Sequence, residues 1–253
     1  MGRDMRTILL AGVIAAIGSA GAMGAEVKVL SAGAVEPGLH KAVELFQKQS
    51  GHTVSIQFNT APQIAKRMQD GYVADILIAP PGGLKQYAEQ GKVATDGHVA
   101  IGKVGAGVTI RPDAPVPDIK TTDALKASVL AADSLVYNTA STGIYLENLF
   151  NKLGIGEQIK AKTTRHANGE AVMEHVIKGK GKEIGFGAIT EIKLYEVKGG
   201  LKLVGPLPAD VQNYTSYGAA LMSNAPQPDA AKAFMAFLGT PAAKQAFVSA
   251  GIE

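Results

Sequence analysis

The sequence contains no cysteine, and this absence removes several classes of protein at once. Disulfide scaffolds, thiolate zinc or iron–sulfur sites and a cysteine nucleophile all require thiols. A strong charge is also missing, because 25 Lys and Arg residues against 22 Asp and Glu residues leave only +3. Such a weak, dispersed charge does not indicate a nucleic-acid-binding protein. Aromatic residues are only 6% of the 253 residues, but the hydrophobic share of 46% excludes general disorder and suffices for one or two cores.

Long apolar runs are missing as well, except for a shorter one near the N-terminus. Arg3 and Arg6 precede the apolar segment Ile8–Ile17, which is too short to cross a bilayer comfortably. Small residues then offer a cleavage site after residue 24 or, alternatively, after residue 22. We therefore predict a signal peptide over residues 1–24 and export to the periplasm. An uncleaved anchor or a buried N-terminal helix is the alternative, whereas the lack of cysteine excludes a lipoprotein.

Strand and helix patterns alternate along the rest of the chain. Alternating apolar residues and short buried runs predict strands, and apolar residues three and four apart predict the helices between them. A proline-rich segment, residues 111–118, separates two such series. The order predicts an α/β protein with two lobes of roughly 100 residues each, both with a mainly parallel sheet flanked by helices. The strands are expected near residues 27–29, 54–58, 75–79, 134–137, 184–189 and 217–222, and the helices near 39–46, 62–68, 84–88, 146–153, 172–176 and after Pro228 and Pro241.

Small and hydroxyl residues follow several of the predicted strands, where a helix is about to begin. Such junctions leave backbone N–H groups open, and the helix start adds partial positive charge, which suits an anion. In open α/β sheets, ligands bind outside the carboxyl ends of the strands. Each junction alone is equally explained by ordinary helix capping. Four junctions divided between two lobes favour an anion-binding cleft, with candidate residues Ser31, Ala32, Gly33, Ala34, Asn59, Thr60, Ala61, Ser141, Thr142, Gly143, Asn168 and Gly169.

In several stretches the chain resembles the type II periplasmic solute-binding proteins of ABC importers, specifically the molybdate-binding-protein-like branch. The matching segments are residues 29–39, 58–79, 141–145, 185–190 and 234–251. The resemblance implies two α/β lobes joined by crossing strands, one ligand clamped between them, no cofactor and no catalysis. It also implies two partners, a small anionic solute and a membrane permease. We expect lobe one over residues 26–104 and 215–253, lobe two over residues 105–214, and a monomer.

The chain departs from the molybdate-binding pattern at three positions. The resemblance implies serine hydroxyls at the first two junctions and a tyrosine hydroxyl at the end of the fifth strand, but Ala34, Ala61 and Ala188 stand there. Thr60 is the nearest hydroxyl. Each lost hydrogen bond would cost a small oxyanion about 1 kcal/mol or more. The sequence therefore favours a small organic acid over molybdate, and a molybdate- or sulfate-type oxyanion is the alternative.

Arginine is scarce after the predicted signal peptide, where only Arg67, Arg111 and Arg165 occur. Guanidinium groups bind carboxylates through two parallel hydrogen bonds, so we expect Arg67 or Arg165 to hold a second anionic group of the ligand. A surface ion pair is the alternative for each. Tyr217 lies near the second crossing between the lobes and is expected either to form the floor of the cleft or to pack in the core.

Catalytic motifs are absent. The five histidines show no HExxH spacing, and no GxSxG occurs, so neither a metal site nor a serine hydrolase is indicated. We expect no enzyme activity. A secreted hydrolase and the effector domain of a transcription regulator are the more remote alternatives, although the latter would carry a helix-turn-helix in place of the signal peptide.

Overall fold

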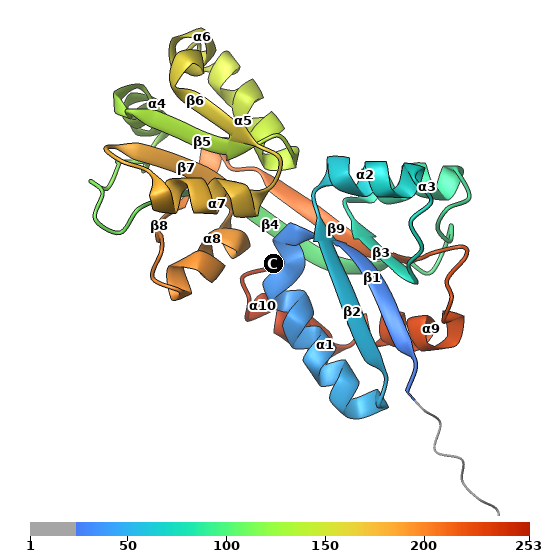
Figure 1. Cartoon of the computed structure of the whole chain (residues 1–253). Coiled ribbons are helices and arrows are strands. Elements are labelled where there is room, and N and C mark those ends of the chain that lie inside the picture. Colours follow the sequence, from blue (N-terminus) through green and yellow to red (C-terminus); the bar gives the residue numbers. More distant parts are fainter. Residues whose placement is uncertain (1–23) are drawn as a thin grey trace, which may run out of the picture.

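The computed structural model describes residues 24–253, so the predicted signal peptide up to residue 23 lies outside the described residues. No helix within residues 24–253 is long and apolar enough to span a membrane. Two groups of strands and helices lie side by side and are linked by two long strands (Figure 1).

Lobe one is built from βα units whose strands are parallel. β1 pairs with β2 on one side and with β3 on the other. Asp75 precedes β3, and its buried carboxylate accepts hydrogen bonds from the backbone N–H groups of Lys28 (2.8 Å) and Gln227 (2.6 Å). The elements are β1 (Glu26–Ala32), η1 (Gly33–Val35), α1 (Glu36–Ser50), β2 (Thr53–Asn59), α2 (Ala61–Gln69), β3 (Ile76–Ala79), α3 (Pro81–Glu89), α9 (Pro228–Leu238) and α10 (Pro241–Val248).

Lobe two repeats this organisation around β5, which is parallel to both β6 and β7. Its helices flank these strands on both faces (Figure 1). The elements are α4 (Thr122–Ala131), β5 (Ser134–Asn138), α5 (Ser141–Lys152), α6 (Gly156–Ile159), η2 (Lys160–Lys162), β6 (Thr163–His166), α7 (Gly169–Lys178), β7 (Glu183–Ala188), α8 (Ile189–Val197), β8 (Lys202–Pro206) and η3 (Ala209–Val211).

The two linking strands are β4 (Val99–Ile110) and β9 (Tyr214–Leu221). The first part of β4 pairs antiparallel with β9, and its second part pairs antiparallel with β7 and β8. The resulting strand order is β2-β1-β3-β9-β4-β7-β5-β6, with β8 beside β4. The sheet is therefore mixed, and the expectation of parallel pairing holds for the outer strands but not for the linking strands.

Separate hydrophobic cores support the two lobes. In lobe one Phe46 packs against Phe234 and Phe237, with ring centroids 4.8 and 5.6 Å apart. In lobe two Phe150 and Phe186 pack edge to face at 5.7 Å, and both are fully buried. Val104 belongs to the first core and Ala106 to the second. The exact lobe boundaries expected from the sequence stay a prediction.

The expected strands and helices are confirmed, but five longer elements were not anticipated from the sequence, namely β4, α4, β6, α8 and β8, and neither was the short helix α6. Strand β4 shows why. Its residues include three glycines and do not alternate clearly between apolar and polar. Gly107 shows why the glycines are there, because a Cβ at this position would lie 2.7 Å from Cγ1 of Ile189. The absence of a side chain lets α8 pack directly on β4.

Candidate functional site

A cavity of about 320 Å³ lies between the two lobes. Six helical segments begin at it, because the residue that precedes each of them lines the cavity. These residues are Ala32 before η1, Thr60 before α2, Pro80 before α3, Ala140 before α5, Asn168 before α7 and Ala188 before α8. Helix starts carry unpaired N–H groups and partial positive charge, so their convergence makes the cavity attractive to anions.

The helix starts differ in how many N–H groups they leave free. Thr60 forms a capping box with Gln63, and the Asn168 side chain accepts from the N–H of Ala171 at 2.8 Å. Ala32, Pro80 and Ala188 have no side-chain hydrogen bond to their helices. The starts of η1 and α8 therefore have no side-chain cap on their N–H groups. The start of α3 offers fewer, because Pro80 and Pro81 have no N–H and the N–H of Gly83 donates to the Pro80 carbonyl at 2.9 Å.

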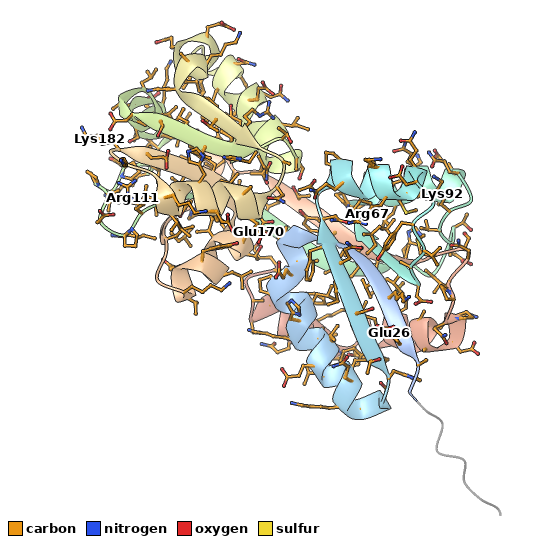
Figure 2. The ribbon with its side chains drawn as sticks, in the orientation of Figure 1. Glu26, Arg67, Lys92, Arg111, Glu170 and Lys182 are labelled. Atoms are coloured by element: carbon orange, nitrogen blue, oxygen red, sulfur yellow. The ribbon has the colours of Figure 1, made fainter. Side chains whose placement is uncertain are left out.

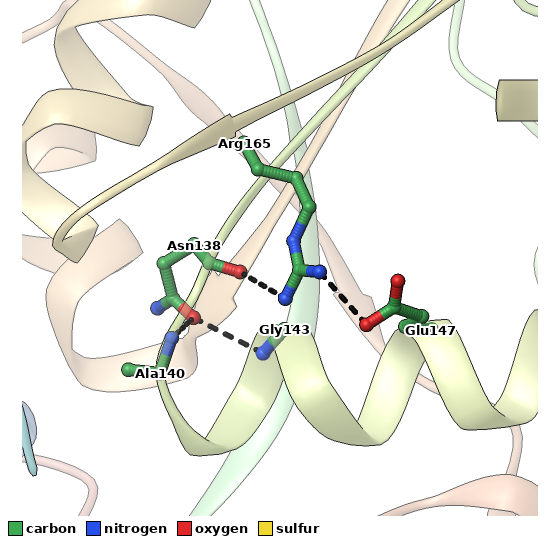
Figure 3. A network of polar contacts seen from close by, with 5 residues as sticks. All are labelled: Asn138, Ala140, Gly143, Glu147 and Arg165. Carbon is green, nitrogen blue, oxygen red and sulfur yellow. Dashed lines mark hydrogen bonds and ion pairs between the residues drawn. The ribbon is translucent and has the colours of Figure 1, made fainter. Parts of the chain in front are cut away.

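The start of α5 is capped from outside the helix. Oδ1 of Asn138 accepts hydrogen bonds from the N–H groups of Ala140 and Gly143, each at 3.0 Å (Figure 3). A Cβ at Gly143 would collide with the Asn138 carbonyl, so only glycine fits. Gly143 is not among the residues that line the cavity, and its N–H already donates to Asn138 and is not left open to a ligand as the sequence suggested. Asn138 lines the cavity as well as capping the helix.

Arg165 is not among the residues that line the cavity. Its guanidinium donates to Glu147 at 2.7 Å and to the Asn138 carbonyl at 3.4 Å (Figure 3), and it lies 5.4 Å from the ring centroid of Tyr137. The ion pair and the aromatic ring hold this side chain against α5 and β5, through Glu147 and Tyr137. Arg165 therefore does not supply the cation that we expected, and it supports the capping residue Asn138 instead.

Arg67 and Arg111 are also not among the residues that line the cavity. Arg67 lies in the last turn of α2, and its guanidinium lies 5.2 Å from the ring centroid of Tyr72. Arg111 donates to the carbonyl of Gly181 at 2.9 Å. Ser31 is fully buried in β1, where its hydroxyl donates to the carbonyl of Ala32 at 3.1 Å. Arg67 and Ser31 were both expected to contact the ligand, and the structure places neither of them among the residues that line the cavity.

The other predicted residues meet at the cavity, although their contact with a ligand stays a prediction. Tyr217 is buried beneath it, and burial raises the pKa of its phenol, with the side chains of Thr215 and Ser141 acting in the opposite direction. Tyr217 therefore keeps its proton and offers a neutral hydroxyl. The residues brought together are Ala32, Gly33, Ala34, Asn59, Thr60, Ala61, Ser141, Thr142, Asn168, Gly169, Ala188 and Tyr217.

Charged lining residues were missed by the sequence reasoning. Glu36, Glu170 and Glu191 line the cavity, each in the first turn of its helix, and Lys198 is the one lining residue with a cationic side chain within residues 24–253. Figure 2 shows Glu170 on the side of lobe two that faces lobe one. Acidic residues are common in first turns because they complement the helix dipole, so the sequence offered no distinguishing signal. The only pattern in the sequence that could have indicated a lining face is the spacing of Glu191, Leu194, Tyr195 and Lys198, which are three and four residues apart along α8 and its C-cap.

Glu191 has the most perturbed carboxyl at the site. Burial raises the pKa of Glu191 to about 7, a backbone hydrogen bond with Ala188 lowers it, and the charge of Glu36 raises it further. A Cβ added to Gly33 would lie 3.2 Å from Oε1 of Glu191, and one added to Gly169 would overlap its carboxyl group. The two glycines, one in each lobe, therefore make the space that the carboxyl group occupies.

Gly169→Ala tests this arrangement. The added methyl group displaces the Glu191 carboxyl within the cavity, and because this group is the flexible end of a side chain, the free energy of unfolding should fall by less than about 1 kcal/mol. Ligand affinity should fall about tenfold, equivalent to about 1.4 kcal/mol. Gly82→Ala is the matched control, because Gly82 also lies in the first turn of a helix and a Cβ there meets nothing within 4 Å. Urea unfolding and calorimetric titration measure both effects, and equal behaviour of the two variants would contradict the assignment.

Comparison with known proteins agrees with this geometry. A family model described as bacterial extracellular solute-binding protein matches residues 27–253. The chain belongs to this family. The solute-binding protein is also 28% identical to an aconitate isomerase from Pseudomonas sp over 231 residues, which are 89% of this chain and 86% of that enzyme.

Solved structures show the same fold. The periplasmic molybdate-binding protein of Azotobacter vinelandii superposes with a TM-score of 0.75 at 18% identity, over 90% of this chain and 98% of that one. The sulfate-binding protein SubI of Mycobacterium tuberculosis H37Rv superposes with a TM-score of 0.70 at 19% identity, over 90% and 86% of the two chains. These solved structures share the two-lobed α/β fold that the sequence predicted.

Proposed function

We propose that this solute-binding protein captures a small organic acid with more than one anionic group and delivers it to the membrane permease of an ABC importer. The convergence of six helix starts on one cavity between the lobes carries the proposal. These starts attract anionic oxygens without needing a metal ion. Within residues 24–253, no group of three His, Cys, Asp or Glu side chains could hold a metal.

Three features support an organic acid over an oxyanion. Ala34, Ala61 and Ala188 line the cavity at three of the helix starts, so no side-chain hydroxyl is available at these three positions, and the hydroxyl groups of the lining come from other positions, including Thr60, Ser141, Thr142 and Tyr217. The volume of about 320 Å³ falls within the range of roughly 300–1,000 Å³ found for pockets that hold organic ligands. The similar aconitate isomerase acts, by its name, on a tricarboxylate.

Titration calorimetry with propane-1,2,3-tricarboxylate, fumarate, sulfate and molybdate tests the choice of ligand. We expect a carboxylate to bind at least about tenfold more tightly than either oxyanion, a difference of about 1.4 kcal/mol. The cavity variant Gly169→Ala should weaken this binding and Gly82→Ala should not. Tighter binding of molybdate or sulfate would replace the proposal with the oxyanion alternative.

Export and partner choice belong to the same proposal. The apolar segment before residue 25 supports cleavage and release into the periplasm, where a monomer would meet the permease. Mass spectrometry of the protein recovered from a periplasmic fraction should show loss of residues 1–24. Recovery of the intact chain in the membrane fraction would indicate a membrane anchor instead.

A second candidate function is isomerisation of a bound unsaturated tricarboxylate, and the Glu191 carboxyl in the cavity favours it. A group whose pKa lies near 7 can accept a proton from a ligand CH₂ group and return it to the former vinyl carbon while the double bond moves between them. No redox partner is needed. The two isomers have equal mass, so proton NMR of cis-aconitate incubated with the protein is the appropriate assay. Unchanged spectra would leave binding as the function.

A further inference from the structure

Glu191 is held at the junction of the two lobes by its neighbours in α8. The preceding residue, Thr190, is fully buried and donates its hydroxyl to the carbonyl of Ala34 in lobe one at 2.6 Å. The following residue, Ile192, is fully buried in lobe two. The main chain of Glu191 is therefore anchored on both sides, and its carboxyl group extends into the cavity between Gly33 and Gly169.

The charges that face Glu191 leave it without a cationic partner. Within residues 24–253, no Lys, Arg or His side chain lies within 4.0 Å of its carboxylate. Lys198 lies two turns further along α8, and its ammonium is 5.1 Å from the ring centroid of Tyr195. The remaining titratable groups at the cavity are acidic or neutral: Glu36 from α1, Glu170 from α7, Tyr195 from α8 and Tyr217 from β9.

A bound anion would add negative charge beside this carboxylate. Repulsion between two negatively charged groups in a desolvated site favours protonation of one of the two groups. A protonated carboxyl group is also a hydrogen-bond donor, whereas the ionised form only accepts. The oxygens of a fully ionised carboxylate or phosphate ligand also only accept hydrogen bonds. They can therefore bond to the protonated form of the Glu191 carboxyl group but not to its ionised form.

We propose that the cavity captures its anionic ligand together with one proton from solvent, held on the carboxyl group of Glu191, whose O–H donates to a ligand oxygen. The inference rests on the proposed function, which supplies the class of ligand. It adds that one proton is bound together with this ligand. Glu191 would thereby provide a donor in a cavity where Ala34, Ala61 and Ala188 offer none. It would also make the protein selective for ligands that present an acceptor at this point.

The direction of the pH dependence follows from the two states of Glu191. Below pH 7 the carboxyl group is already protonated, and the ligand binds without further proton uptake. Above pH 7 it must take up a proton on binding, so affinity should fall by about fivefold to tenfold between pH 7.5 and 8.5 through proton linkage. An ionised Glu191 in the complex would leave the affinity flat over this interval.

Calorimetric titration of the full-length mature protein with propane-1,2,3-tricarboxylate tests the proposal. This probe has no double bond, so it cannot isomerise. Measurements at pH 8 in buffers of different ionisation enthalpy should show uptake of close to one proton for the wild type. Glu191→Gln keeps a donor without a titratable group, so it should show no uptake by the protein and should bind more tightly than the wild type at pH 8.5. Subtracting its profile removes any titration of the probe itself.

Two further variants separate this role from a structural one. Glu36→Gln removes the neighbouring negative charge, so the pH at which affinity begins to fall should move downward while proton uptake persists. Glu89→Gln changes an exposed glutamate at the end of α3 and should leave the profile unchanged. If Glu191→Gln does not fold, two measurements still test the proposal: the number of protons that the wild type takes up on binding, and the change in Glu36→Gln of the pH at which affinity begins to fall.

The outcomes distinguish the inference from the function on which it rests. Tight, pH-independent binding of the probe with no proton uptake would overturn the inference and leave the proposed function standing. Proton uptake that persists in Glu191→Gln would assign the proton to another group and would also overturn it. Failure of propane-1,2,3-tricarboxylate, fumarate, sulfate and molybdate to bind at any pH between 6 and 8.5 would overturn the proposed function and the inference together.

Discussion

Replacing Ala34 and Ala61 together by serine is expected to raise the affinity for molybdate about thirtyfold, since each new hydroxyl donor contributes about 1 kcal/mol. Both alanines line the cavity, one at the start of η1 and the other at the start of α2. Serine is only one oxygen larger than alanine, so the helix starts should keep their positions. Calorimetric titration of the double variant with molybdate at pH 6.5 measures the gain.

A control with the same chemistry away from the cavity is available. Ala65 in α2 and Ala233 in α9 are exposed, so the double variant Ala65→Ser, Ala233→Ser should bind molybdate as the wild type does. The affinity for propane-1,2,3-tricarboxylate should change far less than the affinity for molybdate in the cavity variant. An unchanged molybdate affinity there would show that the missing hydroxyl groups do not determine which anion is preferred.

Asp75→Ala is expected to lower the free energy of unfolding by about 3–5 kcal/mol, because it removes two hydrogen bonds to a buried carboxylate and leaves their N–H donors unsatisfied. The donors are Lys28 in β1 and Gln227 before α9, so one side chain joins segments from both ends of the chain. The backbone carbonyl of Asp75 also accepts from the N–H of Met222, at 2.8 Å, just after β9. Urea unfolding gives the change directly.

Asp70→Ala is the matched control for this effect. Asp70 is exposed at the end of α2, where it pairs with Lys66 at 2.8 Å across one helical turn. Exposed pairs of this kind contribute about 0.3–0.5 kcal/mol, so the control should unfold nearly as the wild type does. Similar losses in both variants would mean that the carboxylate of Asp75 does not hold lobe one together.

The βα units were predictable because their signals are local. The apolar spacing of Leu39, Ala42, Val43 and Phe46 marks the buried face of α1, and the run before Ala79 marks the buried strand β3. Strand β4 was not predictable in the same way. Its glycines are explained by Ile189 and the neighbouring strand β8, which lie about 80 residues or more further along the chain.

Only the backbone part of the candidate site, the helix starts around the cavity, was predictable from the sequence. Residues that precede helices could be recognised because each junction is a short segment whose N–H groups depend on local geometry. Arg165 was assigned to the ligand because the sequence could not show that Glu147, 18 residues away, would take its guanidinium. Glu191 went unnoticed because its significance depends on Gly33, Gly169 and Glu36, which belong to other elements.

The sequence by itself determined the fold class, the family resemblance and helix starts that line the cavity, because these depend on periodicity and on short junction segments. Only the tertiary structure decided which side chains face the cavity. The direction of a long side chain depends on the ion pairs, aromatic rings and empty space that distant segments place around it. Arg165 therefore points away from the cleft toward Glu147, and Glu191 points into it over two glycines from different lobes.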